Sequence, residues 1–511
     1  MKRCFAKLTV LLLLAAALPL RAQDLASYEK RVSVKTLPNG LTVVLWRRPE
    51  APVFSFFTMV DAGSAQDPRN KTGLAHMMEH MAFKGTPDIG TTDYAAEKVA
   101  MEKVEQAYAA YEAERNKQVG QDAQKLAQLQ KSWQDAMSAA DQYVIKNQFG
   151  EIIESHGGVG VNAFTNYDET AYLYSLPANE IELWASLESD RMLHPVMREF
   201  YKERNVVMEE RRMRTDSKPT GRLFEQFLGT AFMANPYHRP TIGYASDLQN
   251  FSATDAADFF RKYYVPSNMV IGLVGDLDPA QVFPIIERYF GRLPNTPKPQ
   301  ELFTEEPPQN SVREVTLHDP SQPIYLEGYH RPNYLAPDDV VYDAISDILS
   351  NGRTSRMYRS LVRDQKIAAA AAGITGMPGE KYGHLFAFYG VPLPGHTNEE
   401  VQKAIHEQIE KLKTQDVSDE ELQMFKTRTK ADLLRGLSSN EGLAEQLAIY
   451  QTRYGDWREL FHYLDRVDKV TKADIRRVSN QVFSENNRTV GVIQTQTAKN
   501  EPAPAASKGA E

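Results

Sequence analysis

Apolar and polar positions along the chain follow two patterns, strict alternation and helical spacing, which succeed each other in a regular order. The first stretch with strand-like patterning comprises Val32–Leu37 and Leu41–Trp46, joined by Pro38-Asn39-Gly40. Because Asn-Gly between two apolar runs favours a tight turn, this stretch predicts a β-hairpin. A third strand is predicted at Val53–Val60, and a segment with helical spacing follows it.

The same order of elements returns in the second half of the chain, starting near Arg313. Each half has strands, a helix, further apolar strands and charged amphipathic helices, and each ends on an apolar run. This repetition predicts an α+β fold of two homologous α/β domains, each with a mainly antiparallel sheet flanked by helices. The second-half elements are expected at Val315–Leu317, Ile324–Tyr329, Asp338–Leu349, Ala368–Ile374, Leu385–Val391 and Thr489–Ile493; first-half counterparts include Gly160–Leu176 and Met269–Gly275.

Proline and charged residues mark the boundary between the two halves. The stretch 294–309 contains five prolines and several charges, which is typical of a linker. We therefore expect an N-terminal domain at residues 23–293, a linker at 294–312 and a C-terminal domain at 313–496. Residues 497–511 consist mainly of Ala, Pro, Lys and Glu, a composition typical of a disordered tail.

One segment of the first half has no counterpart in the second. Residues 92–149 are rich in Ala, Glu, Lys and Gln and contain no proline, which predicts an inserted pair of long helices turning near Val119-Gly120. Two interpretations remain open for this insertion. It is either a solvated structural prop or an element that controls substrate access or partner docking.

The N-terminus has the pattern of an export signal. Lys2, Arg3 and Lys7 precede the apolar run Leu8–Leu20, and Ala22 offers a small residue for cleavage. The apolar run is only 13 residues long, which is short for a bilayer span, although an uncleaved anchor is the alternative. We expect residues 1–22 to be a signal peptide, the protein to be secreted into the bacterial periplasm, and no membrane segment to remain after cleavage.

Charge and cysteine content exclude several classes of function. The chain carries 59 basic and 67 acidic residues, a formal net charge of −8. Removal of residues 1–22, with four basic residues and no acid, changes this charge to −12. Such an acidic chain is a poor partner for nucleic acid or an anionic membrane. Because Cys4 is the only cysteine, the mature chain has no disulfide, no cysteine nucleophile and no thiolate metal ligand.

The candidate chemistry is concentrated in His76-Met77-Met78-Glu79-His80. A helix is predicted over residues 72–84, capped by Thr72 and ended by Gly85. On a helix, His76 and His80 project from the same face, and two neutral imidazoles at this spacing can hold one divalent cation. Glu79 flanks the same site and can accept a proton from an activated water, as in a reversed His-Glu-x-x-His motif.

A catalytic zinc site needs a third protein ligand and keeps one position open. The candidate is in the helical run Phe200–Arg211, where Glu203 and Glu210 are two turns apart on one face and Glu209 points elsewhere. Two carboxylates on one face of a partly buried helix are costly unless they are paired or bind a metal. Spacing alone does not choose between Glu203 and Glu210.

These motifs resemble the pitrilysin/insulinase family of inverted zincins, which includes mitochondrial processing peptidase. The resemblance covers nearly the whole mature chain and makes 23–293 the catalytic metallopeptidase domain and 313–496 the inactive homologous domain. The matching segments are the Asn39-Gly40-Leu41 hairpin, Gly73–Thr86, Gly158–Thr165, Glu203–Glu210, Tyr264–Met269, Val274-Gly275-Asp276 and Ser355–Tyr358.

The resemblance implies a role for each site residue. One Zn²⁺ per chain is expected on His76, His80 and Glu210, with Glu79 as general base and Glu203 as a further catalytic-site acid that supports the metal ligands. The zinc ion would polarise water and the scissile carbonyl. The strand that carries Asn162, Ala163 and Phe164 is expected to pair with an extended peptide substrate. The implied activity is therefore that of a zinc metalloendopeptidase acting on short or unfolded peptides.

One departure from the family pattern concerns the second half of the active site. Active members carry an Arg and a Tyr seven residues apart in the C-terminal half, where they contact substrate and the oxyanion. The two possible alignments place Val362 with Ala369, or Arg363 with Ala370, at these positions, so the tyrosine is missing. We expect this chain to be the metal-bearing subunit of a heterodimer whose homologous partner supplies the Arg/Tyr pair, and otherwise a homodimer.

Two other classes of function remain as alternatives. The chain could be a non-catalytic assembly or peptide-binding subunit of the same family, although such members usually lose their metal ligands. It could also be an unrelated α/β binding protein of the cell envelope. About one tightly bound zinc per chain, lost on substitution of His76, would favour the enzyme over both.

Overall fold

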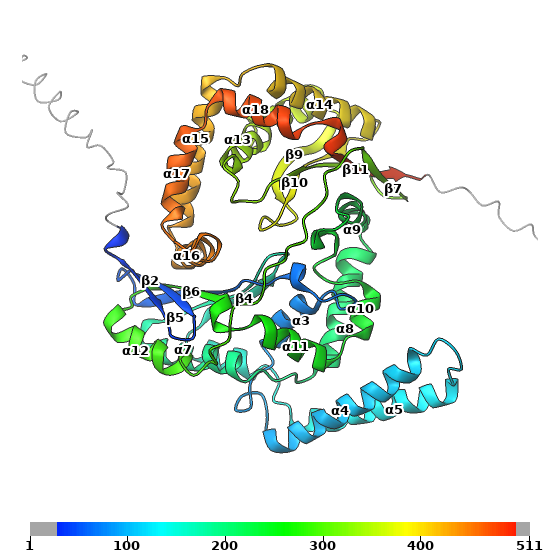
Figure 1. The fold of residues 1–511 in the computed structure, drawn as a ribbon, viewed down its shortest axis with the longest axis vertical. Helices are drawn as coiled ribbons and strands as arrows, with labels where there is room; N and C mark the ends of the chain where they lie inside the picture. Colours follow the sequence, from blue (N-terminus) through cyan, green and yellow to red (C-terminus); the bar gives the residue numbers. More distant parts are fainter. Residues whose placement is uncertain (1–27, 497–511) are drawn as a thin grey trace, which may run out of the picture.

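Two halves of the same plan lie one above the other in the computed structural model, which describes residues 28–496 (Figure 1). The expected signal peptide, residues 1–22, and the expected tail, residues 497–511, lie outside the described residues. Across residues 28–496, no helix has both the length and the apolar character needed to span a bilayer.

The first half is built on a six-stranded sheet with the order β1-β2-β6-β3-β5-β4. Only β2 and β6 run parallel, and the remaining neighbours are antiparallel. The predicted hairpin joins β1 to β2, with Gly40 at a φ of +92° that favours glycine. The strands are β1 (Val32–Thr36), β2 (Thr42–Arg47), β3 (Val53–Val60), β4 (Val159–Thr165), β5 (Thr170–Pro177) and β6 (Met269–Gly275).

The second half repeats this arrangement in a five-stranded sheet with the order β7-β11-β8-β10-β9. Here β7 and β11 are the parallel pair, and the other neighbours are antiparallel. The predicted fold class, two homologous α/β domains with mainly antiparallel sheets, is therefore confirmed. The strands are β7 (Arg313–Asp319), β8 (Ile324–Arg331), β9 (Ala368–Met377), β10 (His384–Pro392) and β11 (Arg488–Thr495); residues 294–312 between the halves contain no helix or strand.

Equivalent asparagines in the two halves make equivalent hydrogen bonds. Asn268 precedes β6 and donates from Nδ2 to the carbonyl oxygens of Tyr263 and Asp61. Asn487 precedes β11 and donates to the carbonyl oxygens of Val482 and His330. The internal repeat therefore extends to single hydrogen bonds at the start of the last strand of each sheet.

Helices flank both sheets. In the first half these are α3 (Leu74–Met81), α4 (Tyr94–Arg115), α5 (Ala123–Ala140), α6 (Gln148–Ser155), α7 (Ile181–Leu193), α8 (Phe200–Arg211), α9 (Pro219–Ala231), α10 (Ala245–Asn250), α11 (Ala253–Tyr263) and α12 (Pro279–Phe290). In the second half they are α13 (Asp339–Ser350), α14 (Asn398–Thr414), α15 (Asp419–Gly436), α16 (Asn440–Tyr454), α17 (Glu459–Lys469) and α18 (Lys472–Val482). The helix α13 occupies the place in the second half that α3 has in the first.

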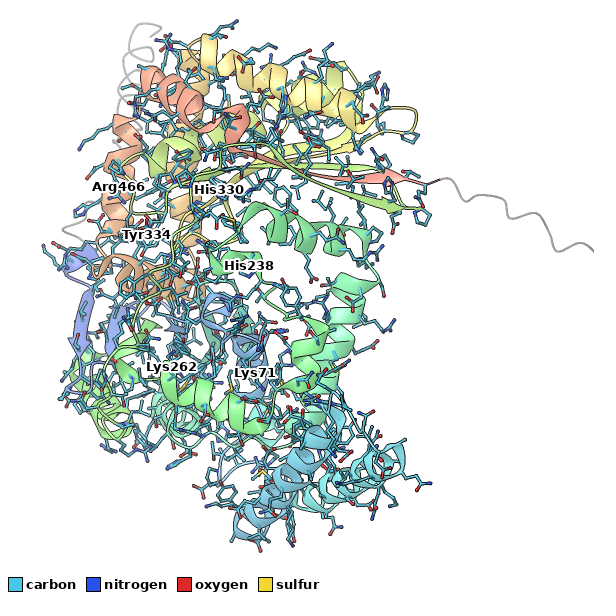
Figure 2. The ribbon with its side chains drawn as sticks, turned by 45° about the vertical axis from the view of Figure 1, so that its right-hand side comes forward. Lys71, His238, Lys262, His330, Tyr334 and Arg466 are labelled. Carbon is cyan, nitrogen blue, oxygen red and sulfur yellow. The ribbon has the colours of Figure 1, made fainter. Side chains whose placement is uncertain are left out.

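Each half contributes one helix to the sheet of the other half (Figure 1). The helix α16 buries Leu443 and Leu447 against the first sheet, in a cluster that includes Trp46 and Phe57. In return, α9 buries Phe227 against β8, β10 and β11 of the second sheet. His330 on β8 is hydrogen-bonded through Nε2 to the carbonyl oxygen at the end of α9 (3.0 Å; Figure 2). The exchange fastens the two halves together through apolar burial.

The helices α4 and α5 form a hairpin that projects from the first half (Figure 1). The connection between them contains Val119 and Gly120, where the turn was predicted, and Gly120 has a φ of +72°. Along its length, Tyr108 of α4 and Trp133 of α5 pack against Tyr201 of α8. The hairpin therefore rests on the helix that carries the candidate third metal ligand.

Candidate metal centre

The helix α3 carries the His/Glu motif, and its N-terminus is capped in an unexpected way. The predicted helix is present but is shorter than 72–84, and the prediction that Thr72 caps it is wrong, because α3 begins at Leu74 after Gly73, whose φ is +96°. Both oxygens of the buried Asp67 accept hydrogen bonds from the first backbone N–H groups, those of Gly73 (2.7 Å) and Ala75 (2.9 Å). The helix ends at Met81, before Gly85, and residues 82–84 form a turn and a bend.

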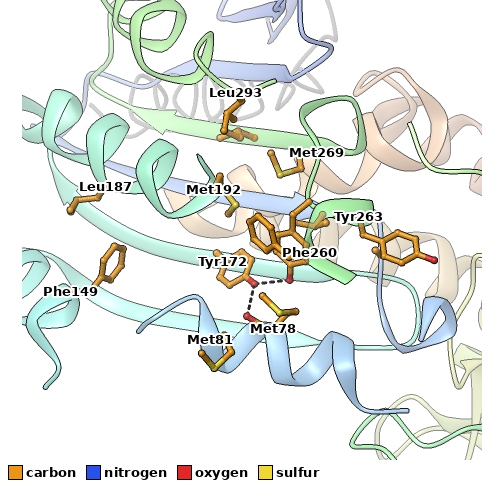
Figure 3. Close-up of a cluster of buried hydrophobic side chains, with 14 of the residues drawn as sticks. Met78, Met81, Phe149, Tyr172, Leu187, Met192, Phe260, Tyr263, Met269 and Leu293 are labelled. Carbon is orange, nitrogen blue, oxygen red and sulfur yellow. Dashed lines mark hydrogen bonds between the residues drawn. The ribbon is translucent and has the colours of Figure 1, made fainter. Parts of the chain in front are cut away.

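The face of α3 opposite the motif is buried in the core of the first half. Met78 and Met81 lie against β5, where the Tyr172 hydroxyl is hydrogen-bonded to the Met78 carbonyl oxygen and to Tyr264 (Figure 3). Because a packed interior permits little adjustment, this contact fixes the rotation of α3 about its axis. The histidines are therefore held on the side that faces α8.

The structure brings His76, His80 and Glu210 together. The Oε2 atom of Glu210 lies 3.7 Å from Nε2 of His76 and 3.6 Å from Nε2 of His80. The ligand atoms of all three residues lie within 4.8 Å of one another, and residues 28–496 contain no other such group of three metal-ligating side chains. The two imidazole rings are nearly perpendicular, with an interplanar angle of 87°.

These three atoms fit a tetrahedral zinc ion. Bonds of the usual zinc–nitrogen and zinc–oxygen lengths place neighbouring ligand atoms about 3.3 Å apart, close to the spacing between Glu210 and each imidazole. At 3.6 and 3.7 Å these contacts are too long for hydrogen bonds, so the three polar atoms face a common point without satisfying one another. Two imidazoles and one carboxylate are the ligands of a catalytic zinc site with one position open.

Glu203 supports the site without belonging to the ligand group. Its Oε1 atom is 2.9 Å from Nδ1 of His80, and its Oε2 atom is 2.6 Å from Nζ of Lys84. A proton on Nδ1 of His80 leaves the lone pair of Nε2 directed at the metal position. Two of the three carboxylates of α8 therefore act on the same imidazole, Glu203 from one nitrogen and Glu210 from the side of the other.

The two histidines of the candidate metal centre differ sharply in pKa. Burial, together with neighbouring His80, lowers the pKa of His76 to about 4. Burial opposes protonation of His80 as well, but the carboxylates of Glu203 and Glu210 outweigh it and raise the pKa of His80 to about 9. Burial likewise opposes ionisation of Glu203, yet hydrogen bonds from His80 and Lys84 lower its pKa to about 2. Without metal, a proton on His80 therefore balances the carboxylates.

Glu79 is placed to act as a base beside the metal position. Its Oε2 atom lies 4.0 Å from Nε2 of His76. Burial raises the pKa of Glu79, although a hydrogen bond from the Thr165 side chain opposes the shift. A carboxylate with a raised pKa is a stronger base than an ordinary glutamate, which suits proton abstraction from water near neutral pH.

The expected substrate strand is β4, which lies at one edge of the first sheet and, within residues 28–496, pairs with β5 alone. Val161, Asn162 and Ala163 line a cavity of about 540 Å³ together with Glu79 and His80. Phe164 packs near Phe57 on the other face of the sheet, with ring centroids 6.0 Å apart. The free strand edge, the base Glu79 and the ligand His80 therefore open into one cavity, to which Asn162 and Ala163 contribute and Phe164 does not.

The second half carries no tyrosine at the position of the family's Arg/Tyr pair. Val362 and Arg363 belong to the π-helix η7 (Tyr358–Asp364), and the exposed Arg363 is paired with Asp364. Ala369 and Ala370 lie on β9, the edge strand of the second sheet. The site on this chain consists of the metal ligands, the base and the strand edge.

Sequence reasoning missed three residues that shape the site: Asp67, Lys84 and Arg214. Lys84 and Arg214 each lie four residues after a site residue, His80 and Glu210, so helical spacing could have found both. Arg214 Nη1 lies 2.6 Å from Glu210 Oε1. Asp67 had no such signal, because it reaches the start of α3 from a preceding turn.

The fold and the site together define a two-domain metallopeptidase fold with an inverted zincin motif on the first domain. The sequence model described as "Insulinase (Peptidase family M16)" matches residues 42–113 and 136–244, and "Peptidase M16 inactive domain" matches residues 250–429. The chain belongs to peptidase family M16, the insulinase family. The stretch that the first model leaves unmatched, 114–135, holds the tip of the α4–α5 hairpin.

The names of two similar proteins and of one similar crystal structure are consistent with this family. The chain is 28% identical to zinc protease PqqE of Helicobacter pylori over 91% of this chain and 93% of that protein. It is 23% identical to mitochondrial-processing peptidase subunit beta of Saccharomyces cerevisiae, covering 89% of each chain. Its structure matches the crystal structure of a protease from Helicobacter pylori with a TM-score of 0.75 and 27% identity, covering 91% of this chain and 99% of that one.

Proposed function

We propose that this chain is a zinc-dependent endopeptidase that cleaves short or unfolded peptides. The observation that carries the proposal is the convergence of His76, His80 and Glu210 with Glu79 beside them, next to a free strand edge. Family membership and the names of the relatives support the same activity.

His76, His80 and Glu210 would hold one Zn²⁺ per chain, and a zinc ion bound there supplies Lewis acidity toward a water molecule and the scissile carbonyl. Glu79 accepts the proton of the attacking water and then donates it to the leaving amine. The edge of β4 at Asn162 and Ala163 binds the substrate backbone as an added strand. Because such pairing uses backbone groups, an extended chain is required and a folded protein is a poor substrate.

We further propose that a second, homologous chain completes the active site. The missing tyrosine at Ala369 or Ala370 supports this arrangement. The yeast relative is named as the beta subunit of a processing peptidase, which also fits a two-subunit enzyme. A homodimer is the simpler form of the same idea. If no partner restores turnover, the chain acts as the peptide-binding or assembly subunit of its family.

The proposed location is the bacterial periplasm, because residues 1–22 have the pattern of a secretory signal. Mass spectrometry of the periplasmic fraction would give a mature N-terminus at Gln23. A protein recovered from the cytoplasm with Met1 intact would contradict this location.

The experiment for the peptidase proposal uses a random peptide mixture and mass-spectrometric mapping of cleavage sites. The zinc-loaded chain is compared with chelated chain, each alone and together with a homologous M16 chain of the same organism. We expect zinc-dependent cleavage that is strongest with the partner. Full-rate cleavage by the single chain would contradict the partner, and absence of zinc-dependent cleavage in every combination would contradict the peptidase.

A further inference from the structure

The two oxygens of the Glu210 carboxylate have different neighbours. Oε2 faces the imidazole nitrogens of His76 and His80, at 3.7 and 3.6 Å. Oε1 is 2.6 Å from Nη1 of Arg214. The carboxylate is therefore turned so that one oxygen points at the metal position and the other is taken up by a guanidinium group.

This division matters because the number of carboxylate oxygens bound to the metal decides whether a position stays open. Two imidazoles and one carboxylate oxygen make three protein ligands, which leaves the fourth tetrahedral position for a small ligand. If both oxygens of Glu210 bound the metal, the protein would supply four ligand atoms, and a small ligand would bind only as a fifth. A catalytic site therefore needs a device that holds the second oxygen away.

We propose that Arg214 is this device: it is a positioning residue that keeps Glu210 bound through Oε2 alone. The inference rests on the proposed zinc site at His76, His80 and Glu210. A hydrogen bond between a cationic guanidinium and a carboxylate is short and strong, so it competes with a second metal–oxygen bond for Oε1.

The local backbone explains why Arg214, and not a neighbouring arginine, reaches Oε1. The helix α8 continues into the π-helix η4 (Arg212–Asp216), where Ser217 N donates to Arg212 O. Arg211 is buried and paired with Glu225, and Arg212 is paired with Glu209 on the solvent side. Each arginine of this segment thus has its own acid, and only Arg214 is paired with a metal ligand.

The Arg214–Glu210 pair contributes little to the stability of the fold. The side chain of Arg214 is 73% exposed while that of Glu210 is 13% exposed, and an ion pair whose cation lies largely in water contributes only a small free energy to folding. The pair at Arg212 and Glu209 has the same chemistry, and its arginine is exposed to a similar extent, with side chains 61% and 51% accessible. Arg212 therefore provides a matched control for loss of an arginine from the same helical segment.

The test replaces zinc with Co²⁺, whose visible absorption depends on coordination geometry and falls as ligands are added to a tetrahedral site. The full-length wild type, Arg214→Ala, Arg214→Lys and Arg212→Ala are loaded with one Co²⁺ each and their spectra recorded. We expect the visible absorption of Arg214→Ala to fall below the wild-type value as Oε1 joins the metal. Arg214→Lys should keep most of the absorption, because an ammonium group also donates to Oε1, and Arg212→Ala should match wild type.

The outcomes separate this inference from the proposed function. A wild-type spectrum in Arg214→Ala with the metal bound contradicts the positioning role of Arg214 alone. An equal loss in Arg212→Ala also contradicts it, because the effect then follows from losing any arginine there. Failure of the wild type to bind Co²⁺ or Zn²⁺ contradicts the metal site itself. Thermal unfolding midpoints of all variants are compared to ensure that each protein is folded.

Discussion

The charged residues of the candidate metal centre are arranged mainly in acid–base pairs. Glu203 pairs with Lys84 and His80, and Glu210 pairs with Arg214. Glu79 accepts a hydrogen bond from Thr165 and lies beside His76, with no lysine or arginine partner among residues 28–496. Glu203 and Glu210 each have a cationic partner and Glu79 has none. The negative charge near the metal position is therefore largely that of Glu79 and of Oε2 of Glu210. This division suits a site that binds a divalent cation and also keeps a base.

Zinc affinity should depend on pH through His80. Its pKa of about 9 means that the metal-free protein carries a proton on His80 at neutral pH, and this proton must leave before the imidazole binds zinc. Zinc binding at pH 7 should release about one proton, and the apparent affinity should rise roughly tenfold per pH unit below pH 9. Calorimetry in buffers with different ionisation enthalpies measures the release. Equal heats in all buffers at pH 7 would contradict this account of His80.

Helical spacing predicted His76, Glu79 and His80 as a group, because three residues within five positions report directly on one helix face. Spacing could not choose between Glu203 and Glu210, and the geometry explains why. Both carboxylates lie on the face of α8 that meets His80, one at Nδ1 and the other on the side of Nε2. Which of the two faces the metal position depends on how far α8 is shifted along α3. The sequence pattern of a single helix gives no information about this shift between two helices.

At the scale of elements, the start of α3 depends on Asp67. Replacing Asp67 with Ala removes the acceptor of two backbone N–H groups and should lower the free energy of unfolding by about 1–2 kcal/mol. Urea unfolding measures this loss. The exposed Asp258, which pairs with Arg261 on α11, provides a control whose replacement should change stability by less than about 0.5 kcal/mol. Equal effects of Asp67→Ala and Asp258→Ala would rule out the capping role.

The hairpin α4–α5 is anchored by a buried ion pair. Glu97 on α4 is fully buried and binds Arg198 through two contacts, at 2.5 and 2.8 Å. Because Glu97→Ala leaves the buried Arg198 without its acid, unfolding should become easier by about 3–5 kcal/mol. Lys98→Ala, at the adjacent exposed position, should have little effect in the same denaturant titration. A loss below about 1 kcal/mol in Glu97→Ala would show that the hairpin is not anchored there.

The chain that follows α5 bears on both interpretations of the inserted segment, a structural prop or an element that controls substrate access. After α5, Ile145 donates to Gly90 O (2.9 Å), and Val144 to Phe149 line the cavity beside Glu79 and His80. The helices α4 and α5 pack against α8, which is the contact expected of a structural support. The sequence predicted the hairpin and its turn from composition, but an even helical composition gives no signal of which helix it contacts.

At the scale of the whole molecule, repetition of strand order was readable from the sequence and the exchange of helices was not. An amphipathic helix such as α9 or α16 reveals that it covers an apolar surface, and its pattern does not identify which sheet provides that surface. The equivalent glycines Gly272 and Gly491 lie where the exchanged helix approaches each sheet. These two glycines are the clearest sequence features at the contacts of α16 and α9 with the sheet of the other half.

Gly272 therefore tests the contact between the halves. A Cβ added at Gly272 would lie 2.1 Å from the carbonyl oxygen of Ala444 on α16, so Gly272→Ala should force α16 off the sheet and cost about 1–3 kcal/mol or more. Gly229 on α9 has open space around its Cβ position, and Gly229→Ala should be neutral or stabilise the protein by up to about 1 kcal/mol. Thermal unfolding compares the two variants. Similar midpoints for both would contradict close packing of α16 on β6.

The central claim is that Glu79 is the base of a zinc peptidase whose metal is held by His76, His80 and Glu210. The most direct measurement is turnover of a peptide substrate by wild type and Glu79→Gln, with bound zinc measured in the same samples and the homologous partner present. We predict one zinc per chain in both proteins and a fall in kcat of roughly 10²–10⁴-fold in Glu79→Gln. Turnover at the wild-type rate in zinc-loaded Glu79→Gln would contradict the account.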